Sequence, residues 1–307
     1  MATFTVNILG CSSASQSERH QQSCQVVNFR DKLFMIDCGE NAQAQFRRMH
    51  LKYNRLGHIF ISHLHGDHFF GLPGLLSTMA LQGEQGTVTI HTFEEGARLL
   101  DSWMRFFNRS ASFEIVYDII TPGERRVLYE DQGITISTFP LYHRVPCAGF
   151  RFQEKPRLRH IDGEAVRFHG VPVWQLRLIK EGADFVKEDG TVIPNARLTL
   201  PADPSGSYAY CSDTMQNPSI AEDVRGVDTL FHEATYDHSM VAMAVERGHS
   251  TALQAAETAR DAGVKRLVLG HFSKRYAQEG EEILLAEARS VFPDTILANE
   301  GMTIEIA

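Results

Sequence analysis

The chain of 307 residues lacks several features that would place it in a particular class of protein. It has no apolar run of the roughly 18 residues that cross a membrane as a helix. Its first residues contain neither a basic stretch nor an apolar one, so we expect no signal peptide. The cysteines are scattered and form no C-x-x-C pair, which favours reduced, mostly buried thiols in a cytoplasmic protein. The five are Cys11, Cys24, Cys38, Cys147 and Cys211.

An excess of positive charge is also lacking, since the formal net charge is −8, which at first argues against a nucleic-acid partner. Basic residues are nevertheless concentrated in two segments. Residues 151–180 hold seven Lys and Arg residues against three acidic ones, and residues 41–66 hold no acidic residue at all. These segments are candidate phosphate-binding surfaces. Ordinary solvated charge is the alternative interpretation.

Hydrophobic residues make up 43% of the chain and charged residues 22%, values typical of a globular protein with a sizeable core. Short apolar runs rich in β-branched residues predict strands. They are residues 4–9, 32–36, 58–62, 88–92, 134–139, 208–211, 229–232, 266–270 and 303–306.

Stretches with apolar residues near 3.6 spacing predict helices at 43–50, 72–81, 94–107, 252–262 and 281–291. We expect Ser250 or Thr251 to cap the fourth of these without a capping box, and Gly263 to end it. Strands and helices alternate in both halves. The pattern favours an α/β fold in which two sheets are covered by helices on their outer faces.

Residues 154–204 break this alternation. They are rich in Arg, His, Gly and Pro, with only weak alternation around 171–178 and no clear core pattern. A stretch of this length without such a pattern is usually functional or disordered. We expect an insertion that protrudes from a single domain spanning residues 1–307.

The strongest local signal is the string His63-Leu64-His65-Gly66-Asp67-His68, between a predicted strand and a predicted helix. Imidazole and carboxylate groups are costly to bury unpaired, and they are natural ligands of zinc. Side chains alternate in an extended loop, so His63 and His65 point the same way. Asp67 and His68 follow at the turn and can reach a second ion. The string therefore predicts a metal site.

Three further candidates follow predicted strands: His143, Asp213 and His271. Each alone would more often be a capping or surface residue. Together they are ligand-type residues at the carboxyl ends of apolar strands, where sites on sheet scaffolds collect.

The H-x-H-x-D-H string is the signature of the metallo-β-lactamase superfamily. Its continuation, Phe69-Phe70-Gly71-Leu72-Pro73-Gly74-Leu75, closely resembles the ribonuclease Z family. Other segments resemble motifs of that family along nearly the whole chain. They are Asn7-Ile8-Leu9-Gly10-Cys11, Asp37-Cys38-Gly39-Glu40, His232-Glu233-Ala234-Thr235, His249-Ser250-Thr251 and His271-Phe272-Ser273-Lys274-Arg275-Tyr276.

The resemblance implies an αββα four-layer sandwich that carries two zinc ions. One zinc would lie on His63, His65 and His143, the second on Asp67, His68 and His271, with Asp213 bridging the pair. The 154–204 insertion lies where this family carries an arm that grips tRNA. The implied activity is endonucleolytic hydrolysis of precursor tRNA that removes the 3′ trailer, leaving a 3′-hydroxyl on the tRNA and a 5′-phosphate on the trailer. A homodimer is also expected, with one subunit's arm presenting tRNA to the other's site.

Three residues are candidates for proton transfer. Asp67 lies where it can orient the attacking water or accept its proton as general base, and a pure ligand role is the alternative. His249 is the candidate general acid, with Glu233 holding its ring in the required tautomer. The alternative for His249 is a histidine at a helix N-terminus without a chemical role.

Three other residues have open roles. Arg275 is suited to a forked contact with a substrate phosphate, or to a surface salt bridge. Asp37 is expected to orient a metal-bound histidine from behind, or to build a turn. His232 is expected to have an orienting or structural role. No role is assigned to the other histidines, His20, His50, His58, His91, His160, His169 and His238, which we expect at the surface or with satisfied hydrogen bonds.

Two other functions remain open from the sequence. The same scaffold could serve a small-molecule hydrolase, such as an arylsulfatase or a cyclic-nucleotide phosphodiesterase. A metal-free binding or scaffold protein is disfavoured by intact ligands at every expected position. Manganese and iron also accept imidazole and carboxylate ligands, so the working metal depends on availability.

Overall fold

The computed structural model describes residues 4–15, 19–108, 111–276 and 278–306. Contacts within the chain divide it into two compact units. The first comprises Met1–Glu130, Thr135–Gln153 and Gly206–Ala307, and the second comprises Asp131–Ile134 and Glu154–Ser205.

The first unit contains two seven-stranded sheets. The first sheet has the order β18-β1-β2-β3-β4-β5-β6. Its strands are β1 (Phe4–Gly10), β2 (Cys24–Phe29), β3 (Lys32–Ile36), β4 (Leu56–Phe60), β5 (Gly86–Thr92), β6 (Phe113–Ile119) and β18 (Thr303–Glu305). The second sheet has the order β17-β16-β15-β14-β9-β8-β7. Its strands are β7 (Arg126–Glu130), β8 (Ile134–Leu141), β9 (Cys147–Glu154), β14 (Ser207–Cys211), β15 (Thr229–Glu233), β16 (Arg266–Gly270) and β17 (Thr295–Leu297).

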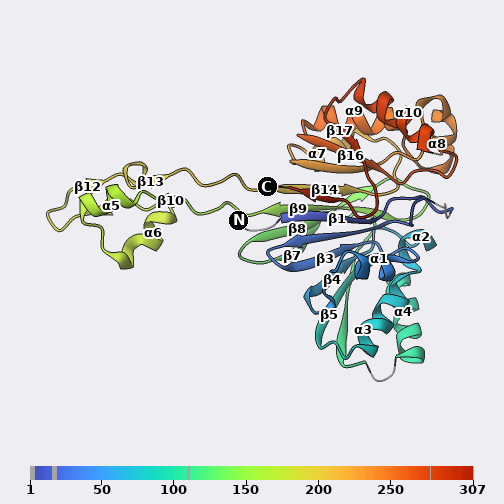
Figure 1. Cartoon of the computed structure of the whole chain (residues 1–307), viewed down its shortest axis with the longest axis horizontal. Helices are drawn as coiled ribbons and strands as arrows, with labels where there is room; N and C mark the ends of the chain where they lie inside the picture. The colour runs from blue at the N-terminus through green and yellow to red at the C-terminus, as the bar shows by residue number, and fades with distance from the viewer. Residues whose placement is uncertain (1–3, 16–18, 109–110, 277, 307) are drawn as a thin grey trace. The chain divides into compact units, whose positions relative to one another are not determined.

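Helices cover the outer face of each sheet, as Figure 1 shows. The first sheet carries α1 (Ala42–Arg48), α2 (Gly66–Phe69), α3 (Leu72–Leu81) and α4 (Glu94–Phe107). The second carries α7 (Pro218–Asp223), α8 (Val241–Arg247), α9 (Ala252–Ala262) and α10 (Gln278–Arg289). The arrangement confirms the predicted four-layer sandwich.

Aromatic side chains fill the space between the two sheets. Phe34 on β3 and Phe60 on β4 face Phe150 and Phe152 on β9, and all four are fully buried. The Phe60 ring centroid lies 5.4 Å from that of Phe150 and 5.8 Å from that of Phe152. Contacts of this kind contribute both apolar burial and a preferred ring geometry. They fix the relative position of the two sheets, on which the site depends.

Parallel pairing brings the ends of several strands to the same edge. Strands β3 to β6 run parallel in the first sheet, and β14 to β17 run parallel in the second. The segments that follow β3 and β4 therefore emerge side by side in the first sheet, and those that follow β14, β15 and β16 do so in the second. These segments contain Asp37, the 63–68 string, Asp213, Glu233 at the end of β15, and His271.

Most long elements agree with the sequence prediction. The helices Leu72–Leu81, Glu94–Phe107 and Ala252–Ala262 have the predicted bounds. One detail was wrong, because Thr251 does form a capping box. Its side chain accepts from the backbone N–H of Gln254, whose own side chain accepts from the Thr251 N–H. The glutamine at the third helical position supplies the reciprocal bond. Gly263 ends the helix with φ 64°.

The second unit has a small hydrophobic core of its own, although the sequence of residues 154–204 shows no clear core pattern. Its elements are β10 (His160–Ile161), α5 (Gly163–His169), α6 (Leu176–Lys180), β11 (Phe185–Val186), β12 (Val192–Ile193) and β13 (Thr199–Leu200). The core consists of Val166, Ile179, Phe185, Ile193 and Leu198. These residues are too widely and unevenly spaced to produce a periodic signal, so the sequence did not reveal them.

The five cysteines are all unpaired and buried, as predicted. Among the helices that the structure describes, none combines the length and the apolar character needed to span a bilayer.

Candidate metal centre and its cleft

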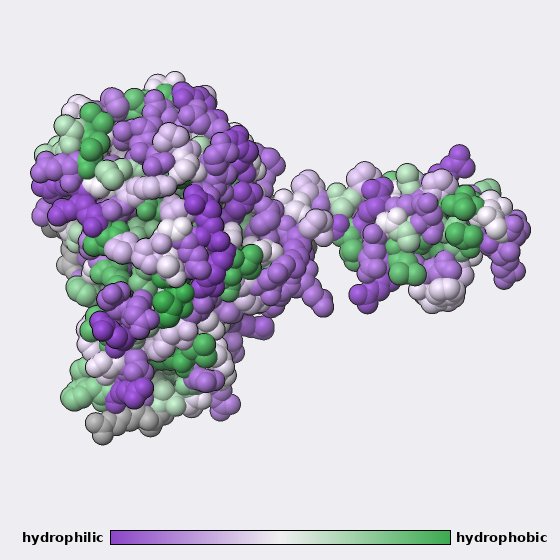
Figure 2. All heavy atoms as spheres, turned by 180° about the vertical axis from the view of Figure 1, so that it is seen from behind, coloured by the Kyte–Doolittle hydropathy of each residue, from purple (hydrophilic) through white to green (hydrophobic). Residues whose placement is uncertain are grey.

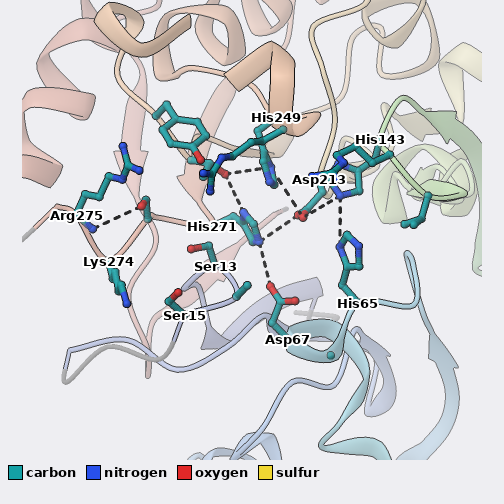
Figure 3. A pocket seen from close by; sticks show the side chains of 18 residues that line it. Ser13, Ser15, His65, Asp67, His143, Asp213, His249, His271, Lys274 and Arg275 are labelled. Carbon is teal, nitrogen blue, oxygen red and sulfur yellow. Dashed lines mark hydrogen bonds and ion pairs between the residues drawn. The ribbon is translucent and has the colours of Figure 1, made fainter. Parts of the chain in front are cut away.

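The residues of the 63–68 string meet His143, Asp213 and His271 at the shared edge of the two sheets. Figure 3 shows Asp67 and His65 facing Asp213, His143 and His271 across the cleft. His63, Asp67, His68, Asp213 and His271 are buried. The structure thus brings together all seven side chains that the sequence nominated as metal ligands. They form two candidate ligand groups, one of His63, His65, His143 and Asp213 and one of Asp67, His68 and His271. Asp213 also lies close to His68 and His271 of the second group.

The first group contains His63, His65 and His143. Nε2 of His63 lies 3.0 Å from Nδ1 of His65, and Nε2 of His143 lies 3.4 Å from the same atom. Oδ2 of Asp213 lies 3.6 Å from Nε2 of His63 and 3.8 Å from Nε2 of His143. Four possible ligand atoms therefore surround one point.

The second group contains Asp67, His68 and His271. The two imidazoles approach with Nε2 atoms 3.3 Å apart. Oδ2 of Asp67 lies 3.4 Å from Nε2 of His68 and 3.5 Å from Nε2 of His271. The second oxygen of Asp213, Oδ1, lies 3.1 Å from Nε2 of His271. Asp213 therefore presents one oxygen to each group.

The outer nitrogen of several of these imidazoles has its own partner. Nδ1 of His68 donates to Asp37 at 2.7 Å, and Nδ1 of His143 donates to the carbonyl of Gly248 at 2.6 Å. Nδ1 of His271 lies 2.9 Å from Oγ1 of Thr235. An imidazole that donates from its outer nitrogen keeps a lone pair on the inner one when neutral.

The inner nitrogen and carboxylate oxygen atoms all present lone pairs to one another, and such atoms cannot hydrogen-bond together without a proton. A metal cation placed between them would accept these lone pairs. Oδ1 of Asp213 is buried and has no hydrogen-bond partner among the residues that the structure describes. The donor set therefore fits metal ions.

Electrostatics supports the same interpretation. Burial lowers the pKa of His63, His65 and His143, which favours the neutral form that metals bind. Burial would also lower the pKa of His68, but the charges of Asp67, Asp213 and Asp37 raise it well above its usual value. Negative charge thus dominates around the second group. It favours any cation placed there.

His249 lies at the edge of this centre, in the turn between α8 and α9. Its Nδ1 lies 3.0 Å from Oε1 of Glu233. Burial would lower its pKa, but the charge and hydrogen bond of Glu233 raise it to about 9. The imidazole is therefore protonated at neutral pH. Its ring lies 5.0 Å from the ring of His143 and 5.5 Å from that of His271.

Glu233 is fully buried and is held by several donors besides His249. Oε1 accepts from the backbone N–H groups of Thr214 and Ser250, both at 3.0 Å. Oε2 accepts from the N–H of Thr235 at 3.1 Å and from its hydroxyl at 2.6 Å. Burial would raise the pKa of Glu233, but the positive charge of His249 lowers it to about 2. A fixed carboxylate thus orients His249.

Asp37 joins the two sheets beneath the centre. It is fully buried, with φ 56° in the left-handed region. Besides His68, it accepts from the N–H and hydroxyl of Ser62, at 2.7 and 2.8 Å, and from the hydroxyl of Tyr210 at 2.8 Å. Four donors from both sheets fix this carboxylate. Residues rarely hold a left-handed conformation unless their surroundings enforce it.

Of the residues with open roles, Arg275 lines the cleft and His232 does not. The guanidinium of Arg275 lies 5.8 Å from the ring centre of Tyr236. His232 is buried on β15, and its Nδ1 donates to the carbonyl of Glu233 at 2.8 Å.

Sequence reasoning missed several residues of the cleft, whose volume is about 640 Å³. Its wall includes three more cationic side chains, those of Arg144, Arg247 and Lys274. In the sequence these three residues lie within two positions of His143, His249 and Arg275, and this closeness could have indicated that they line the cleft. Gly248 is required by geometry: its φ is 77°, and a Cβ there would lie 2.8 Å from Nδ1 of His143.

Two family models match the chain, each over part of its length. The model of the anti-Pycsar protein Apyc1 matches residues 4–157, and that of the beta-lactamase superfamily domain matches residues 163–272.

Curated relatives match end to end. The ribonuclease Z of Bacteroides fragilis strain YCH46 is 51% identical over 306 residues, covering 100% of both chains. The ribonuclease Z of Porphyromonas gingivalis strain W83 is 47% identical with the same coverage.

Solved structures with the same fold include the short form of human tRNase Z. It is 26% identical, with a TM-score of 0.72 and 99% of each chain covered. The metallo-beta-lactamase fold protein YhfI of Bacillus subtilis has a TM-score of 0.70 at 16% identity, covering 99% of this chain and 100% of its own, a likeness of fold alone.

We expect Asp37→Asn to weaken both the fold and metal binding, because an amide places a donor where donors already converge. The loss of stability should be about 3 kcal/mol or more. Metal affinity should fall about 10- to 100-fold, since His68 loses its outer partner. Urea unfolding and metal titration measure the two effects. The same substitution at exposed Asp31 is the matched control, and equal effects at both positions would contradict the role of Asp37.

Proposed function

This chain belongs to the ribonuclease Z family, and on that premise we propose that it removes the 3′ trailer of precursor tRNA. The enzyme is a metal-dependent endoribonuclease of the hydrolase class. Hydrolysis would leave a 3′-hydroxyl on the tRNA and a 5′-phosphate on the trailer. Two donor groups, each approached by one oxygen of Asp213, lie at a cleft that is also lined by Arg144, Arg247, Lys274 and Arg275, and this arrangement supports the proposal.

A phosphodiester substrate suits this cleft on electrostatic grounds. Buried donors can hold cations at its floor, and four cationic side chains line its wall. An anionic backbone with several phosphates would contact both. The forked guanidinium of Arg275 is suited to one such phosphate.

Two zinc ions are proposed, on the ligand sets His63, His65 and His143, and Asp67, His68 and His271, with Asp213 shared. When bound, they would neutralise charge at phosphorus and make the attacking water more acidic. Manganese or iron would fit the same donors.

The chain's own residues would move the protons. Asp67 lies beside both groups and is the proposed general base. Burial would raise the pKa of Asp67, but the positive charge of His68 lowers it, so the carboxylate is available as an acceptor. His249, protonated and fixed by Glu233, is the proposed acid for the departing 3′ oxygen. Asp37 would orient His68 from behind, and His232 would act only on the structure around Glu233.

The second unit is the proposed tRNA-binding arm. Basic residues Arg167, Arg177 and Lys180 are exposed on it. Two aromatic rings are exposed as well, Phe168 at 84% and Trp174 at 72%. Figure 2 shows apolar side chains interspersed with polar ones on this unit. Cations and aromatic faces together are suited to RNA backbone and bases.

We also propose a homodimer in which the arm of one copy presents tRNA to the site of the other, as the family resemblance implies. A cytoplasmic location is also proposed, and the five cysteines, none of them in a disulfide, support it.

The direct test incubates the wild-type chain and Asp67→Ala with a trailer-bearing precursor tRNA and maps the new ends. We expect cleavage by the wild type and a loss of about 10²-fold or more in kcat for the variant, because both a ligand and a base are removed. A wild-type chain that hydrolyses bis-p-nitrophenyl phosphate but leaves precursor tRNA intact would instead favour a small-molecule phosphodiesterase.

The acid role of His249 predicts a difference between substrates. His249→Ala should lower kcat for precursor tRNA by about 10²- to 10⁴-fold, since an alkoxide needs a proton to leave. Bis-p-nitrophenyl phosphate should lose far less, because p-nitrophenolate leaves without one. Equal losses on both substrates would argue that His249 positions the substrate or the metals.

The arm proposal can be tested by closing the hairpin of β9 and β14 into which residues 154–205 are inserted. Gln153 on β9 already pairs with Ser207 on β14, so a Gly-Ser-Gly turn can replace residues 155–205. Cleavage of precursor tRNA should fall about 10²-fold or more as phosphate contacts are lost, while hydrolysis of bis-p-nitrophenyl phosphate persists. Survival of tRNA cleavage would refute the arm assignment.

A further inference from the structure

A charged cluster outside the metal centre joins the two ends of the chain. His20 is 5% exposed, and both of its ring nitrogens face carboxylates. Nδ1 lies 2.8 Å from Oε2 of Glu300, in the turn between β17 and β18. Nε2 lies 2.9 Å from Oε1 of Glu281 on α10. A neutral imidazole has only one N–H, so donation to both carboxylates requires the imidazolium form.

The surroundings of His20 favour that form. Burial would lower its pKa, but the hydrogen bonds and charges of Glu281 and Glu300 raise it to about 9. Arg19 adds a second cation, with Nη1 2.9 Å from Oε2 of Glu281. Cys11 lies 3.3 Å from Nδ1 of His20, and burial raises the pKa of its thiol, which is therefore neutral. Two cations thus face two carboxylates.

This cluster is tied by backbone bonds to the wall of the cleft. The N–H of Ser12 donates to the carbonyl of Gln21 at 2.8 Å, and the side chain of Gln22 donates to the carbonyl of Ala14 at 3.1 Å. The N–H of Gln21 donates to Oε1 of Glu300 at 2.7 Å. Residues 12–15 are therefore anchored through residues 20–22. Ser13, Ala14 and Ser15 line the cleft, and Figure 3 shows Ser13 and Ser15 near His271.

The same wall is joined to the segment that carries His271. The N–H of Phe272 donates to the carbonyl of Cys11, and the N–H of Ser13 donates to the carbonyl of Phe272, both at 3.1 Å. The rings of His20 and Phe272 lie 5.8 Å apart. His271 itself has a separate support in Thr235. Loss of His20 should therefore displace the Ser13–Ser15 wall more than the metal ligand.

We propose that His20, as an imidazolium bridging Glu281 and Glu300, is a positioning residue that holds the Ser13–Ser15 wall of the cleft for substrate binding. The bridge fastens the segment after β1 to α10 and to the turn before β18. Its effect on substrate rests on the proposed phosphodiesterase function, whereas the charged bridge itself does not.

The test compares His20→Gln with the wild type and with His50→Asn, an exposed histidine, as the control. We expect KM for precursor tRNA to rise about tenfold with kcat within about twofold, the pattern of lost binding that is equal in ground and transition states. A fall in kcat with KM unchanged would overturn the positioning role. So would kinetics equal to those of the control.

A pH series separates a charged bridge from simple packing. A histidine whose folded pKa is raised to about 9 contributes stability that is complete below its unfolded value near 6.5 and is lost as pH rises through 9. The difference in urea midpoint between wild type and His20→Gln should therefore be largest near pH 6 and shrink above about pH 9. A difference that is constant across this range would overturn the bridge.

A second variant covers the case in which His20→Gln folds poorly. Adding Glu300→Gln removes the negative charge that a neutral side chain at position 20 leaves unbalanced, so the double variant should recover part of the lost stability and of the KM. No recovery would contradict the pairing. Metal content should be the same in wild type, His20→Gln and Cys11→Ser. If the wild type held one more metal ion per chain than Cys11→Ser, the cluster would be a metal site, and the proposed bridge would be overturned.

The two proposals fail separately. A wild-type chain that leaves precursor tRNA intact refutes the proposed function and leaves the pH series unaffected. In that case the KM for bis-p-nitrophenyl phosphate measures the effect of the Ser13–Ser15 wall on binding. We expect this KM to rise in His20→Gln as it would for precursor tRNA.

Discussion

Seven imidazole and carboxylate groups converge at one edge of this molecule, and three of the imidazoles are held in place by partners on their outer nitrogens. Asp37, Gly248 and Thr235 hold the outer nitrogens of His68, His143 and His271. Without such ties the rings could rotate away from one another and relieve the repulsion of converging lone pairs. With them, the inner atoms remain directed at two points that favour positive charge. The chemistry of the cleft depends on this constraint.

The residues that hold these imidazoles in turn depend on how the two sheets pack. Asp37 follows β3 of the first sheet yet is bonded by Tyr210 on β14 of the second, and Glu233 ends β15 while binding donors of three different loops. The aromatic layer between the sheets sets the distance over which these bonds form. A shift of one sheet by a fraction of an ångström would therefore be felt at the candidate metal ligands, although the four phenylalanines between the sheets are not among the residues that line the cleft.

The sequence predicted what is local and missed what depends on the folded backbone. The 63–68 string and the single ligands after strands were recognisable because residue type and strand position coincide there. Gly248 and Thr235 hold two of the imidazoles through a backbone carbonyl and a hydroxyl. Neither residue type is a typical metal ligand, so no sequence pattern predicted these contacts. Strands β2 and β9 were not predicted: β2 is buried on both faces and shows no alternation, and the alternating Phe150 and Phe152 of β9 are interrupted by Arg151 and end at Glu154. His20 was set aside as a histidine without a role, since its carboxylate partners lie more than 250 residues away along the chain.

Most of the second unit, Glu154–Ser205, is inserted into a hairpin, between strands that pair as Gln153 with Ser207, and it has a core of five buried residues of its own. A segment joined at such a point behaves as a cassette. It can be lengthened, shortened or rebuilt while the pairing of β9 with β14 keeps its register and the seven ligand-type side chains keep their geometry. Under the proposed function, the choice of substrate and the chemistry at phosphorus would thus be separately adjustable within one polypeptide.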